Sequence, residues 1–144
     1  MRKTDRNRMR VLIIVSIGIF MVCLDTTVIN VALSNLKLSL GINLSGLQWV
    51  IAAYTISFAA VLLCAGSLGD RLGPKKVFCI GLIIFSCSSA LCGVSYHLYF
   101  LVFSRVLQGI GAALLVANSL SILQEIFTVP SERAKAFGVW GGVG

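Results

Sequence analysis

Two ionisable residues, Asp25 and Arg105, interrupt long apolar stretches of this 144-residue chain. A charge inside a membrane-spanning segment is costly, and such residues usually serve transport or pair with one another. At 1.5 Å per helical residue, Asp25 and Arg105 lie about 13 Å and about 12 Å from the helix ends that face the same side of a membrane. We therefore expect the two charges to pair or to share a water-filled cavity.

The Asp25 carboxyl group has two interpretations. In the leading one it alternates between protonated and ionised forms and so handles protons. In the other it stays ionised beside Arg105, as a structural ion pair that sets helix register. Gln108 lies on the helix face of Arg105, and Asn30 follows Asp25 on the same apolar run. Both residues are candidates for the lining of a cavity.

The elements that position these residues are indicated by composition. Hydrophobic residues make up 58% of the chain and charged residues 12%, against about 45–50% and about 25% in soluble domains. This balance excludes a soluble or disordered chain and leaves an integral membrane protein. The apolar runs are continuous and long enough to cross the hydrocarbon layer as helices rather than as strands. We predict an all-α bundle with spans at residues 11–33, 49–69, 77–94 and 98–126, and an incomplete fifth span at 137–144.

The basic residues predict the orientation of these spans. Of the twelve Lys and Arg residues, Lys37 lies on one side of the membrane and Arg105 lies within a span. The other ten lie on the opposite side: Arg2, Lys3, Arg6, Arg8, Arg10, Arg71, Lys75, Lys76, Arg133 and Lys135. Such an asymmetry over short loops marks the cytoplasmic side. Residues 1–10 are therefore expected to be a basic cytoplasmic leader, and residues 11–144 a multi-pass transmembrane bundle.

Several other classes of function find no support in the sequence. The charge of +7 follows the loops rather than a soluble basic face, so we expect no nucleic-acid partner. The five cysteines are scattered within spans without metal-ligand spacing, and His97 stands without a nucleophile. We expect no metal, no cofactor and no enzymatic activity. Because the last run stops at Gly144 after about eight residues, less than a span requires, we expect a fragment of a longer protein, or a last segment that is not a true span.

The connection between the second and third runs carries an ordered motif. By composition, residues 66–76 form an ordinary positive-inside loop with glycines suited to close helix contact. Their order resembles the major facilitator superfamily signature G-x-L-a-D-r-x-G-r-k-x-x-l, with matches at Gly66, Leu68, Asp70, Arg71, Gly73 and Lys75. The chain departs from this signature at Gly69, Pro74 and Phe78.

Two further motifs support the same resemblance. The fourth-span signature l-x-x-x-R-x-x-q-G-x-g-a-a is met by Leu101, Arg105, Gln108, Gly109, Gly111, Ala112 and Ala113. Residues 24–33 resemble the L-D-x-T-v-V-N-v-A-L-P element of the fourteen-span drug:proton antiporter branch, with departures at Ile29 and Ser34. The resemblance covers nearly the whole chain and implies a major-facilitator-type helical bundle.

The resemblance also implies roles for particular residues. Asp25 and Arg105 would take part in proton coupling, while Tyr54, with Asn30 and Gln108, would line the substrate cavity. The cytoplasmic gate would comprise Gly66, Asp70, Arg71, Gly73 and Lys75, with Glu125 as a candidate partner of Arg71.

The leading hypothesis is a proton-coupled efflux transporter of hydrophobic or cationic small molecules in the cell (inner) membrane. Its partners would be the substrate, protons, the lipid bilayer and the remaining transporter helices. Two alternatives stay open: a small four-span antiporter that works as an oligomer, and a non-transporting fragment that packs with partner membrane proteins. A reading frame that continues into further spans would favour the first hypothesis.

Overall fold

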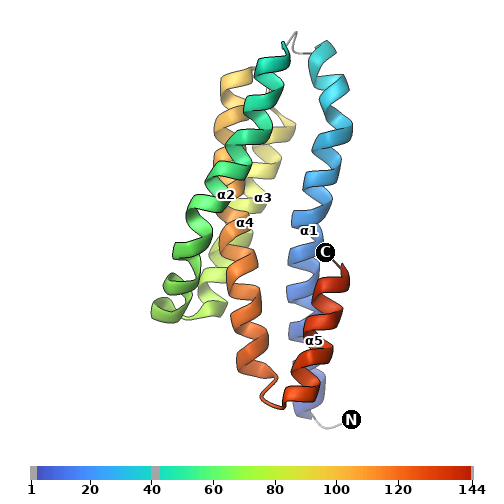
Figure 1. The fold of residues 1–144 in the computed structure, drawn as a ribbon, viewed down its shortest axis with the longest axis vertical. Helices are drawn as coiled ribbons and strands as arrows, with labels where there is room; N and C mark the ends of the chain where they lie inside the picture. The colour runs from blue at the N-terminus through green and yellow to red at the C-terminus, as the bar shows by residue number, and fades with distance from the viewer. Residues whose placement is uncertain (1–2, 40–42, 144) are drawn as a thin grey trace.

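The computed structural model describes the backbone of residues 3–39 and 43–143, and the side chains of these residues except 3–5, 30 and 32–39. The described chain consists of five α-helices and contains no strand: α1 (Lys3–Ser39), α2 (Leu44–Leu72), α3 (Pro74–Gly93), α4 (Leu98–Ile126) and α5 (Pro130–Val143) (Figure 1). Four segments are long and apolar enough to cross a membrane: Arg6–Ile29, Leu44–Leu72, Pro74–Gly93 and Leu98–Ile126. The prediction of an all-α membrane protein is confirmed.

The helices extend beyond most of the expected spans. α1 begins within the basic leader, because nothing between the leader and the apolar run breaks a helix. α2 begins five residues before the expected span, where the Asn43 side chain accepts a hydrogen bond from the Gly46 N–H at 2.9 Å and so caps the first turn. α3 begins at Pro74, a residue suited to the first turn. Residues 137–143 of the range expected for the fifth span form the second half of α5, and residue 144 lies outside the described residues.

α4 lies between α2 and α3 and is the most deeply buried helix (Figure 1). Its glycines permit close helix crossings on both sides. A Cβ atom on Gly109 would lie 2.5 Å from the Tyr54 carbonyl oxygen of α2. A Cβ atom on Gly111 would lie 2.6 Å from the Phe85 backbone nitrogen of α3. Small residues of this kind let membrane helices approach each other closely, so α2, α3 and α4 form a tight unit.

α1 lies beside this unit, and α5 packs against its lower half (Figure 1). The apolar core between α1 and α4 includes Val15, Val22 and Leu115. The Trp140 indole N–H donates to the Ser119 hydroxyl at 3.1 Å and joins α5 to α4. This placement brings the middle of α1, with Asp25, against the buried face of α4.

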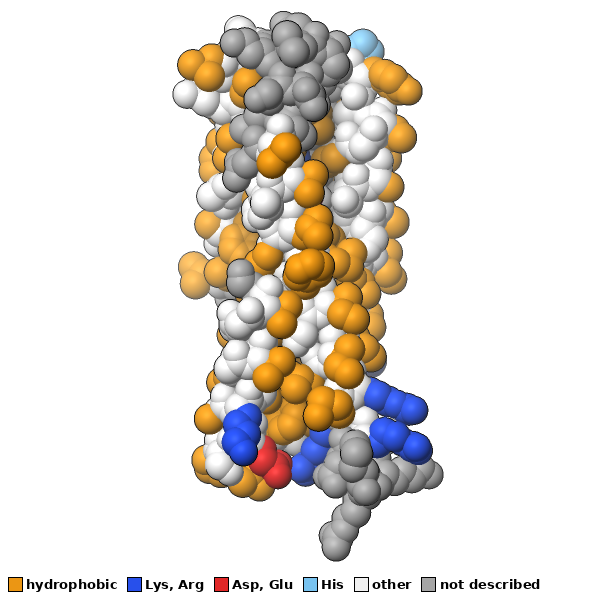
Figure 2. Space-filling view, turned by 90° about the vertical axis from the view of Figure 1, so that its right-hand side faces the viewer, with side chains coloured by type: hydrophobic (Ala, Val, Ile, Leu, Met, Phe, Trp, Pro, Cys, Tyr) orange, Lys and Arg blue, Asp and Glu red, His pale blue; other side chains and the backbone are white. Residues whose placement is uncertain are grey.

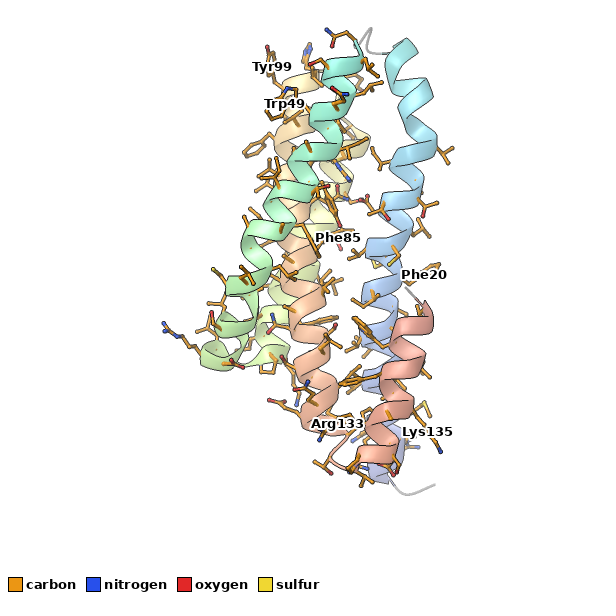
Figure 3. All side chains as sticks on the ribbon, viewed as in Figure 1. Phe20, Trp49, Phe85, Tyr99, Arg133 and Lys135 are labelled. Carbon is orange, nitrogen blue, oxygen red and sulfur yellow. The ribbon has the colours of Figure 1, made fainter. Side chains whose placement is uncertain are left out.

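The two ends of the bundle differ in chemistry. Lys and Arg side chains gather at one end, here named the basic end, and apolar side chains cover the middle (Figure 2). Arg133 and Lys135 lie at the basic end, whereas Trp49 and Tyr99 lie at the opposite end (Figure 3). Leu63 and Tyr99 are 87% and 88% exposed, which suits a surface in contact with lipid rather than water.

Candidate functional site

Asp25 and Arg105 meet between α1 and α4. Arg105 Nη1 donates to Asp25 Oδ2 at 2.7 Å, so the two charges form an ion pair. The Arg105 side chain is 3% exposed and the Asp25 side chain 17%. The matched depths inferred from the sequence therefore correspond to direct contact, and the acidic partner keeps limited access to the surroundings.

Gln108 completes a ring of hydrogen bonds with this pair. Its Nε2 donates to Asp25 Oδ1 at 2.7 Å, and its Oε1 accepts from Arg105 Nη1 at 2.7 Å. The side chain of Gln108 is fully buried. Both oxygens of the Asp25 carboxylate thus accept a hydrogen bond from α4, one from a charged donor and one from a neutral donor.

Tyr54 supplies an aromatic surface to the same site from α2. The Arg105 guanidinium carbon lies 4.4 Å from the centre of the Tyr54 ring, a cation–π contact. The Tyr54 ring stacks in turn on Phe58, with ring centres 6.1 Å apart. The guanidinium is therefore held between a carboxylate on α1 and an aromatic face on α2.

The local sequence of α4 explains why these groups converge. Arg105 and Gln108 are three residues apart and share one helix face. Gly109 follows directly, and its missing side chain leaves room for the backbone of α2 at Tyr54 and for the Ser57 hydroxyl. The motif that carries the charge thus also carries the glycine that brings the aromatic ring close to it.

Cys92 contributes to the site from α3, the fourth helix there, and the sequence did not reveal it. Its thiol lies 3.5 Å from Gln108 Oε1 and donates a hydrogen bond to it. The cysteines are scattered within the spans, and no spacing pattern distinguishes Cys92 from the other four. The contact depends on how α3 is rotated against α4, which no local pattern indicates.

Of the predicted cavity residues, Tyr54 and Gln108 lie at the ion pair. The side chain of Asn30 lies outside the described residues, so its expected place in the cavity stays a prediction. Among the residues that the structure describes, no group of three or more His, Cys, Asp or Glu side chains is arranged to hold a metal ion.

The residues predicted to form a gate lie apart from this site, around the turn between α2 and α3. Gly73 has φ of +94°, a backbone conformation that side chains with a Cβ rarely adopt. Its N–H donates to the Gly69 carbonyl at 2.8 Å and ends α2. The glycine therefore permits the sharp reversal into α3 and fixes where Asp70, Arg71 and Lys75 emerge.

The exposed charges at this turn point to two different recesses. Asp70 and Glu125 line one recess of about 490 Å³, together with Gly69, Gly73, Pro74, Ser121 and Gln124. Arg71 lines another beside Cys64 and Leu114. The suggested Arg71–Glu125 pair is wrong for this conformation, since no such ion pair occurs among the described side chains. The two residues line different recesses.

A second buried polar residue, Asn118, also escaped the sequence analysis. Its Nδ2 donates to the Ala65 carbonyl of α2 at 3.1 Å and to the Leu114 carbonyl of its own helix at 2.9 Å. A Cβ atom on Gly69 would overlap the Asn118 side-chain oxygen. An asparagine within an apolar run is a signal of the same kind as Asp25, and it could have been found on that ground.

Comparison with known proteins shows which family the chain resembles and which transporters it is similar to. The family model of the Major Facilitator Superfamily matches residues 15–144. The chain is 40% identical over 140 residues to the methylenomycin A resistance protein of Bacillus subtilis (strain 168), which covers 97% of this chain and 30% of that protein. It is also 39% identical over 133 residues to the riboflavin transporter RibZ of Clostridioides difficile (strain 630). The aligned residues make up 92% of this chain and 29% of RibZ.

A third relative is the puromycin resistance protein pur8 of Streptomyces alboniger. It is 38% identical over 139 residues, which cover 96% of this chain and 28% of that protein. The chain thus spans about three-tenths of the length of each of these relatives.

Proposed function

This chain belongs to the major facilitator superfamily, and from that premise we propose that it forms part of a proton-coupled exporter of hydrophobic or cationic small molecules. It is a multi-pass membrane protein. Transport by alternating access requires two bundles that rock around a site near the middle of the membrane. The chain would supply helices of one bundle, and further helices of the same transporter would supply the other.

The observation that carries this proposal is the buried ion pair between α1 and α4. A purely structural role would give the Asp25–Arg105 pair little advantage, because a buried ion pair often stabilises the folded state no more than apolar residues of the same volume. A role in transport explains why the pair is kept in an apolar bundle. The carboxylate is the more exposed partner, so a proton or a cationic substrate can reach it more readily than it can reach Arg105.

The proposed cycle uses the charge of Asp25. When Asp25 is ionised, it holds Arg105 by a charge-assisted hydrogen bond and ties α1 to α4. When Asp25 takes up a proton, this tie weakens and the helices can separate. Tyr54 and the Gln108 amide line the same site and would contact substrate.

The exposed charges of the α2–α3 turn are the proposed gate. Gly73 shapes the turn and Gly66 lies within α2, while Asp70, Arg71 and Lys75 present exposed charges around the turn. In this proposal they contact the other bundle in one conformation and separate from it in another. Asp70 and Arg71 form no ion pair with each other in the described structure, which leaves both for such contacts.

We propose that the basic end faces the cytoplasm, with the N-terminus on that side. The support is the clustering of Lys and Arg at this end (Figure 2) and the position of Trp49 and Tyr99 at the other (Figure 3). Single cysteines introduced at Asn43 or Ser95 should react with a membrane-impermeant thiol reagent added outside intact cells, on a background without the native cysteines. A cysteine introduced at Ser131 should react only after lysis, and labelling of it in intact cells would reverse the orientation.

The function is tested by Asp25→Asn in the complete coding sequence that contains this chain. The asparagine keeps the shape of Asp25 and one of its two acceptor oxygens, but it cannot titrate. Efflux of a fluorescent lipophilic cation driven by an imposed pH gradient should be lost, when it is measured per amount of folded protein in the membrane. Thr55→Ala, on the exposed face of α2, is the matched control and should transport normally.

The opposite result has a definite meaning. If Asp25→Asn retains near-normal gradient-driven efflux, Asp25 is not in the proton pathway and its pair with Arg105 is structural. A structural role also predicts that apolar replacements of Asp25 harm insertion more than asparagine does.

The name of one relative suggests a second candidate function. RibZ is named a riboflavin transporter, so transport of a polar aromatic molecule is the competing assignment. The two assignments separate in one experiment, because vesicles preloaded with riboflavin or with the lipophilic cation report which is moved and in which direction. The four-span oligomer and the non-transporting fragment stay as alternatives, and crosslinking of the expressed protein and of its membrane partners tests them.

A further inference from the structure

The ring around Asp25 cannot stay unchanged when Asp25 takes up a proton. At present Oδ1 accepts from Gln108 Nε2 and Oδ2 accepts from Arg105 Nη1. A protonated carboxyl group carries an O–H donor that needs an acceptor of its own. Arg105 has no acceptor atom, so within the ring only the Gln108 amide oxygen can serve.

The Gln108 amide can present that oxygen by turning over. Its oxygen now faces Arg105 and Cys92, and its nitrogen faces Asp25. A rotation of the amide by about half a turn exchanges these two atoms. The oxygen then accepts from the protonated Asp25, while the nitrogen hydrogens face Arg105, which is itself only a donor.

This exchange affects Arg105 as well as Asp25. Arg105 loses its charged acceptor when Asp25 is neutralised, and it loses the Gln108 acceptor when the amide turns. The amide would therefore pass the protonation of Asp25 on to Arg105.

Cys92 is suited to both orientations of the amide. A thiol is a weak donor and a weak acceptor. In the present orientation Cys92 donates to Gln108 Oε1 at 3.5 Å. After the exchange, its sulfur would accept from Gln108 Nε2, which would then face Arg105 and find no acceptor there. Cys92 therefore matters more in the protonated arrangement, where the amide nitrogen has no other partner in the ring.

We propose that the Gln108 amide turns over when Asp25 is protonated, and that Cys92 is the positioning residue that holds the amide in both orientations. The inference rests on the proton-coupled function proposed above. The step moves one proton from water onto the Asp25 carboxylate and breaks no covalent bond. It assigns to α3 a part in coupling that the sequence motifs do not contain.

The ionisable groups around Asp25 are few. Arg105 faces it from α4, Tyr54 from α2 and Cys92 from α3, and Cys23 lies near it on α1. Arg105 is the one charged group of these four near neutral pH, since tyrosine and cysteine ordinarily ionise above it. A change at Cys92 or Gln108 therefore alters hydrogen bonding to Asp25 without altering the charge around it.

The test compares Cys92→Ser with Cys92→Ala in the complete coding sequence that contains this chain. Serine keeps a donor and an acceptor, whereas alanine removes both. We expect Cys92→Ala to move the pH of half-maximal gradient-driven efflux down by about 0.5 unit, a threefold change in proton concentration. Cys92→Ser should stay near wild type. Cys87→Ala, at an exposed cysteine of the same helix, is the matched control and should cause no shift.

A second comparison asks whether Cys92 acts through Gln108. Gln108→Met keeps an unbranched side chain of similar length and removes the amide. In this background Cys92→Ala should have no further effect on the pH profile. A mere packing role would give additive losses and would rank Cys92→Ala above Cys92→Ser, because alanine is tolerated better than serine at an apolar contact.

Each outcome decides the inference. Equal pH profiles for the two Cys92 variants, or a shift that persists with Gln108→Met, would overturn it while leaving the role of Asp25 intact. Efflux that does not respond to the pH gradient in the wild-type protein, or that survives Asp25→Asn, would refute the proposed function itself. The two failures are therefore distinguishable in the same vesicles.

Discussion

Removing the charge of Asp25 while Arg105 stays in place should lower the stability of the bundle by more than the loss of one hydrogen bond would. Asp25→Asn leaves the Arg105 guanidinium, whose side chain is 3% exposed, without a counter-charge. Stranding a buried charge typically costs about 3–5 kcal/mol. Because the Asp25 side of the pair is 17% exposed and admits some water, we expect the lower end, about 3 kcal/mol.

Replacing Arg105 should lower the free energy of unfolding less than replacing Asp25 does. Arg105→Gln leaves a carboxylate that can take up a proton and become neutral, so we expect a loss of about 1–3 kcal/mol, the penalty of an unsatisfied buried group. The variant with both changes has no buried charge. Its loss should fall short of the sum of the single losses by about 1–3 kcal/mol, the coupling energy of groups in direct contact.

The assay is unfolding of the complete transporter in mixed micelles by a denaturing detergent, followed by tryptophan fluorescence. Asp25→Asn combined with Lys75→Gln is the matched control, because Lys75 is exposed at the far end of the bundle. Its two losses should add to within about 0.5 kcal/mol. The same additivity for Asp25 and Arg105 would refute the reasoning, since it would mean that the two charges do not interact in the folded protein.

Two further predictions concern the close packing of α4. Gly109→Ala should destabilise strongly or abolish folding, because its Cβ would lie 2.5 Å from the Tyr54 carbonyl oxygen, a backbone atom, whereas Gly66→Ala meets no atom within 4 Å and should be nearly neutral in the same unfolding assay. Gly69→Ala should lower stability while Asn118 is present and should be tolerated with Asn118→Ala, because the added Cβ overlaps the Asn118 oxygen. An equal cost in both backgrounds would contradict the second prediction.

The position of Asp25 and Arg105 along the membrane normal was predictable because a helix advances by a constant rise. Counting residues from the helix ends placed the two charges at one depth, and the structure joins them at 2.7 Å. The contact of Gln108 with Arg105 followed from helical spacing. Their roles in transport rest on the resemblance and on the proposals above, and the structure alone does not assign them.

The partners from other helices were harder to predict. The resemblance implied a cavity role for Tyr54, but its place over the Arg105 guanidinium depends on the close crossing at Gly109. The thiol of Cys92 meets Gln108 because of the rotation of α3, and local sequence carries no information on that angle. The suggested Arg71–Glu125 pair failed for the same reason, since depth at the bundle end was considered but direction around the helix was not.

The sequence by itself determined that this chain is a helical membrane protein, where its basic residues gather, and which two buried charges share a depth. These properties follow from composition, from the length of apolar runs and from the constant rise of a helix, all of which are local. Only the tertiary structure decided which side chains surround those charges. Neighbours across helices depend on how each helix is rotated and how closely it crosses the next, and this is set by packing between residues far apart in the chain.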